Sequence, residues 1–387
     1  MEIIEESLDK LIKYIEKENY KGHDPYDALN SWIPFHVFGK WGPIVGTQLL
    51  KRSPINIRQL IGIKKDYNSK GMGLILKAYC NLYRLKKNEI YLEKAQMIFE
   101  WLINNYIPGY SGIAWGYNFP WANPKEYVCR FMPTVVATAN VVDGLFCYWG
   151  LTKDERAKRA IISAAEYVKK DIPTIKLDEG VGFGYHQLSR EVCYNASLFA
   201  AEILLRANIV EGVEPNNLIK DAVSLVLSKQ KDDGSWYYSY DPVKRTERRQ
   251  IDFHQGFVLV SLHTIYGHTN FLHNQLYDAI SRGLKFYKCK EFEPNGKSRW
   301  RYPASWPVDI HNQSQGIITF SLLKDYHPDY LDFANTVAQW TIKNMQDESG
   351  YFYYRGYRLF TNKISYMRWS NAWMLLALST LLLNDIS

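Results

Sequence analysis

The chain has 387 residues, 47% of them hydrophobic, and a formal net charge of +7 at pH 7. This length suits one large domain or two ordinary ones, and no apolar run reaches the roughly 18 residues that mark a membrane-spanning helix. The basic residues are not gathered into an arm of the kind that binds nucleic acid. The densest basic run, 244–249, is expected either as a solvated linker or as a clamp for a carboxylate.

The start of the chain and its cysteines bear on the cellular compartment. Residues Met1–Glu6 are acidic and lack the basic start and apolar core of a secretory signal. The five cysteines are scattered and form no CxxC pair, which favours reduced thiols over a disulfide framework or a zinc site. We therefore expect a cytoplasmic protein without a membrane span.

From the N-terminus onward, amphipathic segments alternate with segments that are apolar all round. A helix with one apolar stripe covers a core, whereas a helix that is apolar all round is buried. The expected outer helices are Glu2–Lys17, Glu89–Asn104, Asp154–Lys170, Asn217–Lys229, Leu276–Tyr287 and Tyr330–Asn344. The expected inner helices are Asp66–Leu85, Thr134–Leu151, Val192–Ile209, Asp252–Tyr266, Asp309–Tyr326 and Tyr366–Leu383.

Six outer and six inner helices in alternation predict an all-α fold, a single (α/α)6 toroid domain over residues 1–387. An open right-handed solenoid of the same hairpins is the alternative. Loops rich in glycine and aromatic residues precede the inner helices, and a few short hairpin strands are expected in them. These loops are Trp32–Gly46, Gly112–Tyr117, Gly180–Tyr185, Gly234–Tyr238, Gly296–Tyr302 and Gly350–Tyr354.

Two resemblances support this architecture. The segment Gln230–Trp236 resembles the Q-x-x-x-G-x-W element of terpenoid-cyclase-type toroids, and Gln346–Tyr351 is a degenerate second copy. A wider resemblance links the chain to a prokaryotic group associated with polysaccharide-assembly genes. Its similar segments are Gly22–Ser31, Val192–Ser197, Ile251–Leu262 and Asn362–Trp373.

The second resemblance implies a function in carbohydrate metabolism, since that group is similar in architecture to six-hairpin glycosidases and polysaccharide lyases. Some of its members are labelled delta-aminolevulinic acid dehydratase. That label implies a βα barrel with a lysine Schiff base, and the present sequence has no alternation of strands and helices.

Aligning the inner helices by their apolar runs gives a polar residue at the third position of each start, namely Asn68, Asn195, His254, His311 and Ser370. The inner-helix starts of a toroid face one end of its central cavity, and helix N-termini favour anions. We therefore expect a polar bowl, rimmed by aromatic loops, that suits a glycan.

Three aspartates stand where helix caps belong: Asp66, Asp252 and Asp309. Gln255, three residues after Asp252, is expected to complete a capping box. Hydrolysis of a glycosidic bond would instead use two carboxylates, for which Asp252, Asp309 and Glu191 are the candidates.

Elimination or C5 epimerisation at a uronic acid needs a base and a group that neutralises the carboxylate. His254, His311 and Tyr194 are the candidate bases, and Asn195 and Arg368 are candidate neutralising groups. The Asp-x-His pairs are poor metal chelators, because residues two apart on a helix face different directions. Motifs of the common cofactor sites are also missing, so we expect neither a metal nor a cofactor.

The sequence thus predicts a carbohydrate-active enzyme of polysaccharide metabolism that acts on an anionic, uronate-containing glycan by lyase, epimerase or hydrolase chemistry. The alternatives are a non-enzymatic glycan-binding or scaffold subunit of a polysaccharide-assembly system and an isoprenoid-binding toroid. The expected substrate-binding residues are Asn68, Asn195, Arg368, Arg130, Trp41, Trp115, Trp236, Trp300 and Tyr366.

Overall fold

A computed structural model describes residues 2–386, and over this range the chain forms the predicted all-α toroid. The outer helices are α1 (Glu2–Lys17), α4 (Glu89–Asn104), α6 (Glu155–Asp171), α8 (Asn217–Ser228), α10 (His273–Glu291) and α12 (Asp329–Met345). The inner helices are α3 (Ser69–Lys86), α5 (Val135–Thr152), α7 (Tyr194–Glu211), α9 (His254–Tyr266), α11 (Ile310–Leu322) and α13 (Ala372–Ile386). A π-helical turn, Met367–Asn371, leads into α13.

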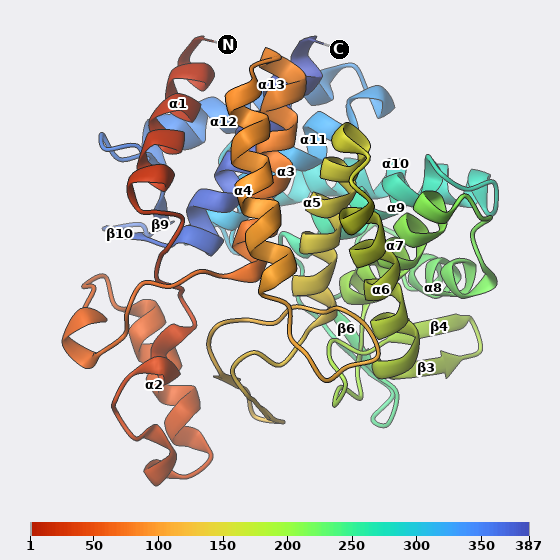
Figure 1. The fold of residues 1–387 in the computed structure, drawn as a ribbon, viewed down its shortest axis with the longest axis horizontal. Coiled ribbons are helices and arrows are strands. Elements are labelled where there is room, and N and C mark those ends of the chain that lie inside the picture. Colours follow the sequence, from red (N-terminus) through yellow and green to blue (C-terminus); the bar gives the residue numbers. More distant parts are fainter. Residues whose placement is uncertain (1, 387) are drawn as a thin grey trace.

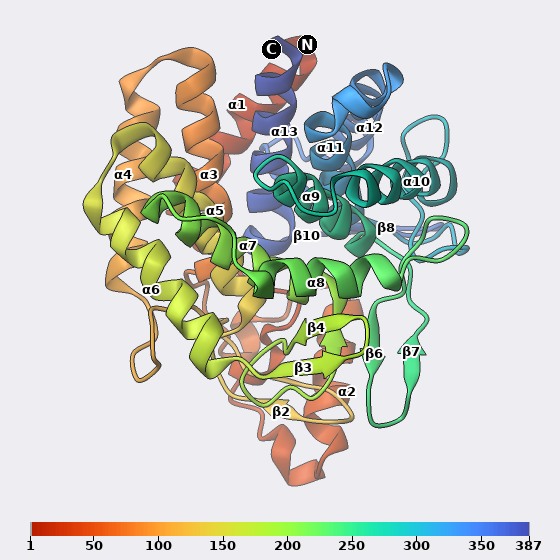
Figure 2. The same ribbon diagram turned by 90° about the vertical axis from the view of Figure 1, so that its right-hand side faces the viewer.

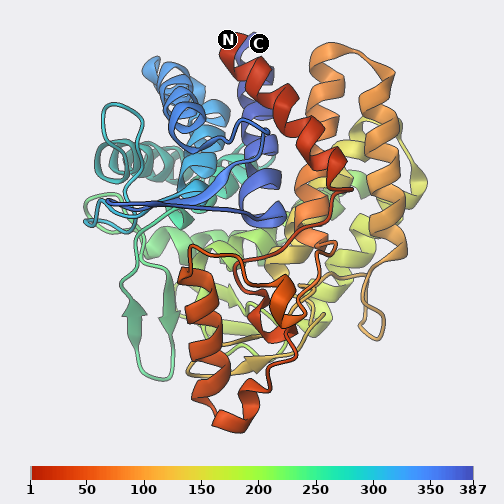
Figure 3. The same ribbon diagram turned by 90° about the vertical axis from the view of Figure 1, so that its left-hand side faces the viewer.

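The ring of inner helices is closed. Each inner helix packs against the next one in the chain, and α13 packs against α3. α1 contacts both α12 and α13, so the first hairpin joins the last. Figure 2 shows the inner helices surrounded by the outer ones, and the two ends of the chain lie at the same end of the molecule in all three ribbon views (Figures 1 to 3). The prediction of a closed toroid is therefore confirmed, and the open solenoid is not formed.

Five loop glycines set the distance between neighbouring hairpins. A Cβ atom added to any of them would lie between 1.9 and 2.7 Å from a backbone carbonyl oxygen of the next outer helix in the ring. The pairs are Gly112 with Ser163, Gly180 with Asp221, Gly234 with Arg282, Gly296 with Thr336, and Gly350 with Lys10. The last pair joins the sixth loop to α1, so the same contact repeats across the closure of the ring.

Replacing Gly350 with alanine is expected to destabilise the ring closure. Gly350 has φ +104, and an added Cβ would lie 2.3 Å from the carbonyl oxygen of Lys10. Gly109 is a matched control, since its φ is +91 and nothing lies within 4 Å of its added Cβ. Both substitutions carry a backbone strain of about 1–3 kcal/mol, and Gly350→Ala should lose about 1–3 kcal/mol more from the clash. Urea unfolding of the two variants measures the difference; equal losses would contradict it.

Polar residues near the inner-helix starts hold the same loops from inside. In each of five repeats, an inner side-chain oxygen accepts a backbone N–H from the loop at 2.6 to 3.1 Å. The donor and acceptor pairs are Trp115 and Thr138, Phe183 and Ser197, Trp236 and Gln255, Ser298 and Gln313, and Phe352 and Asn371. These polar residues therefore have a structural task in each of these five repeats.

This device corrects three sequence-based expectations. Gln255 does not form a capping box with Asp252, because its side chain both accepts from and donates to the main chain of Trp236. Trp115 and Trp236 do not offer stacking faces, since both side chains are fully buried. Their indole N–H groups donate to the carbonyl oxygens of Leu102 and Val226 near the ends of the preceding outer helices.

A long insertion, residues 18–68, separates α1 from α3 and carries α2 (Trp41–Arg52). The expected loop Trp32–Gly46 is therefore wrong in its second half, where α2 begins, and the 3-10 turn Phe35–Phe38 precedes it. The insertion lies at the end of the ring opposite to the chain termini and extends beyond the toroid there (Figures 1 and 3).

Short antiparallel strands join the loops at this end of the ring, as predicted. β1 (Trp121–Ala122) pairs with β2 (Tyr127–Val128), and β3 (Thr174–Leu177) pairs with β4 (Gly180–Phe183). β5 (Val192–Cys193), β6 (Ser239–Asp241) and β7 (Thr246–Arg248) form one sheet, and β8 (Val308–Asp309), β9 (Tyr353–Gly356) and β10 (Thr361–Ser365) form another. One helix of residues 2–386, α5, is apolar and long enough to cross a membrane, but 61% of it is buried inside the fold, as in a core helix.

Candidate active site

The starts of α9 and α11 bring the two predicted histidines to one aromatic ring. His254 is the first residue of α9, and His311 is the second residue of α11. The centroid of the Phe253 ring lies 4.3 Å from that of His254 and 4.4 Å from that of His311. The side chain of His254 is 20% exposed, whereas His311 is 1% exposed. One imidazole therefore lies at the edge of this cluster and the other inside it.

Asp252 holds the imidazole of His254. Its Oδ1 lies 2.5 Å from Nδ1 of the ring and accepts the backbone N–H of His254 at 3.3 Å. Its Oδ2 accepts a hydrogen bond from Gln250 at 2.7 Å. Burial raises the pKa of Asp252, but the charge and hydrogen bond of His254 outweigh it and hold that pKa below its usual value. A carboxylate on Nδ1 fixes the tautomer in which Nε2 accepts a proton.

His311 lies inside a box of aromatic rings. Its centroid is 4.4 to 5.8 Å from the centroids of Phe253, Phe257, Trp369 and Trp373. Neither ring nitrogen has a hydrogen-bond partner among residues 2–386. Burial, reinforced by nearby positive charges, lowers the pKa of His311 well below 6.5. A neutral imidazole has one donor and one acceptor nitrogen, so His311 has hydrogen-bonding capacity that no group of residues 2–386 uses.

The buried imidazole is expected to make the fold sensitive to acid. The folded protein keeps His311 neutral, whereas the same imidazole in the unfolded chain binds a proton near pH 6.5. As the pH drops below 6.5, the unfolded state therefore takes up a proton before the folded state does, and the free energy of unfolding falls. Each unit by which the pKa is lowered corresponds to about 1.4 kcal/mol. His311→Gln should flatten this slope in urea unfolding across that range. His263, which burial also keeps below its usual pKa, is present in both proteins and cancels; parallel slopes would contradict the prediction.

Lys70, the second residue of α3, places its side-chain amino group beside the box. Its Nζ lies 5.1 Å from the ring centroid of Trp373 and 5.8 Å from that of Phe257. Lys70 is buried and makes no hydrogen bond or ion pair with the part of the chain that the structure describes. Burial, followed by the charge of Arg368, lowers the pKa of Lys70 well below its usual value. An amine in this position is suited to meet a negative group on a ligand.

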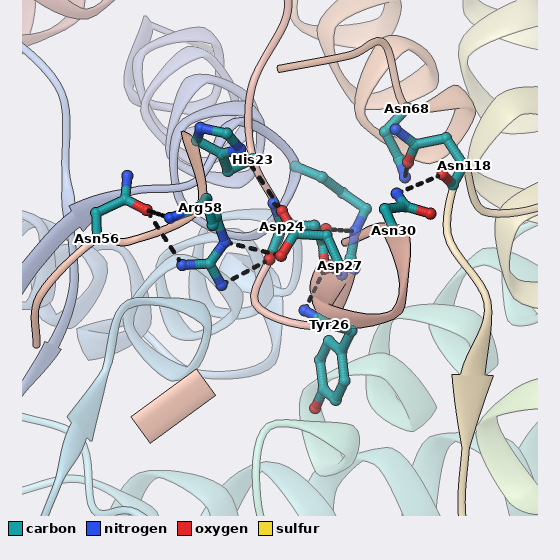
Figure 4. Close-up of polar contacts among 10 residues, drawn as sticks. His23, Asp24, Tyr26, Asp27, Asn30, Asn56, Arg58, Asn68 and Asn118 are labelled. Atoms are coloured by element: carbon teal, nitrogen blue, oxygen red, sulfur yellow. Dashed lines mark hydrogen bonds and ion pairs between the residues drawn. The ribbon is translucent and has the colours of Figure 1, made fainter. Parts of the chain in front are cut away.

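The acidic residues of the segment Gly22–Ser31 fasten the insertion to the start of α13. Arg368 donates from Nε to Oδ2 of Asp24 at 2.6 Å and from a terminal nitrogen to Oδ1 at 2.8 Å. Arg58 donates to Asp27 at 2.7 Å and to the carbonyl oxygen of Asp24 at 3.1 Å. Figure 4 shows Asp24, Asp27 and Arg58 packed together. The guanidinium of Arg368 is thus committed to a protein carboxylate beside the site.

Asp309 is occupied by three donors. Its side chain accepts the backbone N–H of His311 at 2.9 Å, which confirms the expected cap of α11. It also accepts from Nε of Arg355 at 2.6 Å and from Nε1 of Trp369 at 2.9 Å. The Trp300 ring stacks near this group, with its centroid 4.2 Å from the guanidinium of Arg355. A carboxylate held in this way is poorly placed to act as a nucleophile or an acid.

The two predicted asparagines lie at inner-helix starts but bond to protein groups. Asn68 caps α3, and its side chain donates to Asn118 at 2.7 Å (Figure 4). The expected cap Asp66 lies outside the helix, because Asn68 offers its side chain at the position where the chain turns into α3. Asn195 accepts a hydrogen bond from Sγ of Cys193 at 3.0 Å.

Tyr194 faces a different polar region. Its hydroxyl donates to Glu247 at 2.7 Å, and Glu247 lines a hollow of about 540 Å³ beside β7. The other residues around this hollow are Ser228, Lys229, Lys231, Tyr237, Tyr240, Arg245, Thr246 and Arg249. Part of the basic run 244–249 thus lines a hollow, and its use as a carboxylate clamp stays a prediction.

Other candidates lie away from the two histidines. Glu191 forms an ion pair with Lys125, and Arg130 forms one with Asp66 at 3.1 Å. Tyr366 is fully buried. Trp41 lies in α2 and is 60% exposed. The structure therefore brings His254, His311, Asp252, Asp309, Arg368 and Trp300 into one region and leaves Tyr194, Glu191, Arg130, Trp41, Trp115 and Trp236 outside it.

Several residues of the site were not predicted. Lys70 follows the polar start of α3. A lysine at the beginning of an apolar helix is the sequence feature that could have identified it as a site residue. Lys51, a half-buried residue of α2, donates to the hydroxyl of Tyr26, and desolvation lowers its pKa. Asp24 and Tyr26 belong to the segment Gly22–Ser31, which carried the family resemblance without an assigned role.

Comparisons with known proteins agree on the fold. No family model and no curated protein matches the chain. Among solved structures, a cellobiose 2-epimerase from Bacillus thermoamylovorans is 14% identical, covers 81% of this chain and 87% of its own, and has a TM-score of 0.64. A C. acetobutylicum glycoside hydrolase from family 105 is 13% identical over 81% and 93% of the two chains, with a TM-score of 0.59. An α-1,6-mannanase from Salegentibacter is 10% identical over 84% and 90%, with a TM-score of 0.58.

Proposed function

We propose that this protein is a carbohydrate-active enzyme of polysaccharide metabolism that moves a proton at a carbon atom of a uronate-containing glycan. His254 is the general base, and Asp252 orients it. The observation that carries the proposal is the pair of imidazoles on Phe253. One has its Nδ1 fixed by a buried carboxylate, and the other has two nitrogens that no group of residues 2–386 contacts by a hydrogen bond.

The chemistry follows from these two groups. Nε2 of His254 takes the C5 proton of the uronate, and the electron pair passes into the adjacent carboxylate group of the sugar. In epimerisation, a proton from water returns to C5 on the opposite face, and the neutral His311 hydrogen-bonds the sugar rather than supplying that proton. In elimination, the same electron pair expels the oxygen substituent at C4, which takes a proton from water, and leaves a C4–C5 double bond. Both routes use the same base.

The cations near the box support an anionic substrate. Charge that develops on the sugar carboxylate needs a positive partner in a dry site. Lys70 is buried and unpaired within residues 2–386, whereas Arg368 and Arg355 are each bonded to an aspartate. Lys70 is therefore the group assigned to the substrate carboxylate, in place of the predicted Arg368.

Hydrolysis is the second candidate. The predicted carboxylates disfavour it, whereas Glu291, whose pKa burial and the charge of Asp252 raise well above its usual value, would supply the protonated acid. A glycosidase of the usual kind needs one carboxyl group that stays protonated. Asp24 and Asp309 are each bonded to an arginine, and the pKa of Asp252 lies below its usual value. The positive charges near the aromatic box, on Lys70 and Arg368, also fit an anionic sugar better than the isoprenoid of the third interpretation.

The test is a panel of uronate-containing oligosaccharides incubated in deuterated water. We expect deuterium at C5 without cleavage for an epimerase, or absorbance of an unsaturated product for a lyase, and His254→Gln should remove either signal. New reducing ends without unsaturation would identify a hydrolase. Binding without any of these products would overturn the enzymatic proposal in favour of a glycan-binding or scaffold subunit.

A further inference from the structure

Helix α2 presents an apolar stripe to solvent. Trp41, Val45 and Leu49 recur at the i, i+4, i+8 spacing of one helix face. They are 60%, 50% and 68% exposed. A twelve-residue helix of a folded protein normally turns such a face inward, so this face has a task outside the fold.

The opposite face of α2 fixes the orientation of the helix. A Cβ atom added to Gly42 would lie 1.9 Å from the carbonyl oxygen of Phe35, and one added to Gly46 would lie 2.4 Å from the Phe35 ring. Lys51 near the end of the helix is tied to Tyr26 of the insertion. The helix therefore cannot rotate to bury Trp41, Val45 and Leu49 without losing these contacts.

Other large apolar side chains of the same insertion are exposed as well, and together with the stripe we call them the insertion patch. They are Trp32, Val37, Phe38, Ile55, Ile57 and Leu60. The insertion stands out from the toroid at the end opposite to the chain termini (Figures 1 and 3). Tryptophan and phenylalanine are typical of surfaces that enter the boundary between lipid headgroups and acyl chains.

The charged residues within the stretch of chain that carries the insertion patch have one sign. The sequence has neither aspartate nor glutamate between Ser31 and Lys65. Lys40, Arg52 and Lys64 are exposed within that stretch. An amphipathic helix with exposed aromatic residues and flanking cations is the pattern of a helix that lies on an anionic membrane. Two copies of this patch facing each other would bring like charges together, which disfavours a symmetric dimer.

We infer that the insertion patch docks this protein onto the surface of an anionic lipid membrane, with α2 lying in the interface. The partner is the lipid surface itself, recognised by apolar burial of the stripe and by the exposed cations. This inference goes beyond the proposed sugar chemistry and does not depend on it.

Flotation with lipid vesicles tests the inference. The full-length protein is mixed with vesicles of pure phosphatidylcholine or with vesicles in which part of it is replaced by phosphatidylglycerol. The protein should float with the anionic vesicles and much less with the neutral ones, and added salt should weaken the binding because it screens the cations.

Two variants and one control separate the contributions. Trp41→Ser combined with Leu49→Ser should reduce the fraction of protein bound at limiting lipid by roughly tenfold or more. Lys40→Glu combined with Arg52→Glu should reduce the fraction bound to anionic vesicles by a similar factor. Met97→Ser is the control, since Met97 is 48% exposed on the outer helix α4. It should bind like the wild type.

Three results would overturn the inference: no flotation of the wild type, equal flotation of the wild type and the double variants, or equal loss in the Met97→Ser control. Analytical ultracentrifugation without lipid tests the competing explanation, a dimer that forms through the insertion patch. A dimer that Trp41→Ser with Leu49→Ser dissociates, together with no vesicle binding, would assign the insertion patch to a second copy of the chain. The activity of the variant with Trp41→Ser and Leu49→Ser on a soluble oligosaccharide should equal that of the wild type.

Discussion

Asp252→Asn is expected to lower turnover by about 10²–10⁴-fold while leaving the free energy of unfolding nearly unchanged. Gln250 donates to Oδ2 of Asp252, and Arg301 lies 3.6 Å from the same oxygen. These donors favour an asparagine whose amide nitrogen faces His254. A donor against Nδ1 forces the ring proton onto Nε2, so His254 can no longer accept a proton from the substrate.

Steady-state rates of Asp252→Asn and His254→Gln on the active oligosaccharide check this prediction. Both variants should lose turnover far more than substrate affinity, because the lost contact serves the transition state. Comparable rates for Asp252→Asn and the wild type would remove His254 from the role of base. Urea unfolding of both variants serves as the control for the fold.

Arg368→Met is expected to cost about 3–5 kcal/mol of stability. Asp24 is 4% exposed and would lose both hydrogen bonds to the guanidinium, which leaves a buried charge without its partner. Adding Asp24→Asn should recover much of that loss, because the amide is neutral and its oxygen can still accept the backbone N–H of Tyr26.

An exposed pair provides the matched control for this cycle. Arg156 also binds an aspartate, Asp154, through Nε and a terminal nitrogen, but its side chain is 44% exposed. Arg156→Met should therefore cost less than about 1 kcal/mol. Urea midpoints of the single and double variants provide the comparison. An Arg368→Met loss no larger than that of Arg156→Met would show that the buried pair does not hold the insertion.

The helices of the ring could be predicted because their burial is periodic. Glu2–Lys17 and Glu89–Asn104 have the same bounds in sequence and structure, since a clear apolar stripe and polar flanks define them. Five inner helices begin one to three residues later than predicted, and at the sixth a π-helical turn, Met367–Asn371, separates the predicted start Tyr366 from α13. α3 begins at Ser69 rather than Asp66, because either Asp66 or Asn68 is an acceptable cap and only tertiary contacts decide between them.

The candidate site was less predictable because neighbouring polar residues have different tasks. His254 and Gln255 are adjacent, yet one meets the aromatic cluster and the other holds the loop of Trp236. The glycine-aromatic loops likewise contain buried tryptophans that no local pattern separates from exposed ones. Lys70 and Asp24 come together only through the folding of the insertion onto α13, which is a contact between distant parts of the chain.

The joint between Gly350 and α1 has a consequence for the connectivity of the fold. The contact that closes the ring is of the same kind as those between successive hairpins. The covalent backbone is interrupted between α13 and α1, but the packing of the hairpins is not. A circularly permuted chain, with its ends bridged by a short flexible linker and a new opening at the exposed Val213 between α7 and α8, should keep every helix pair. Such a permutant would carry its new ends on a different hairpin, so fusion partners could be attached away from the original chain ends.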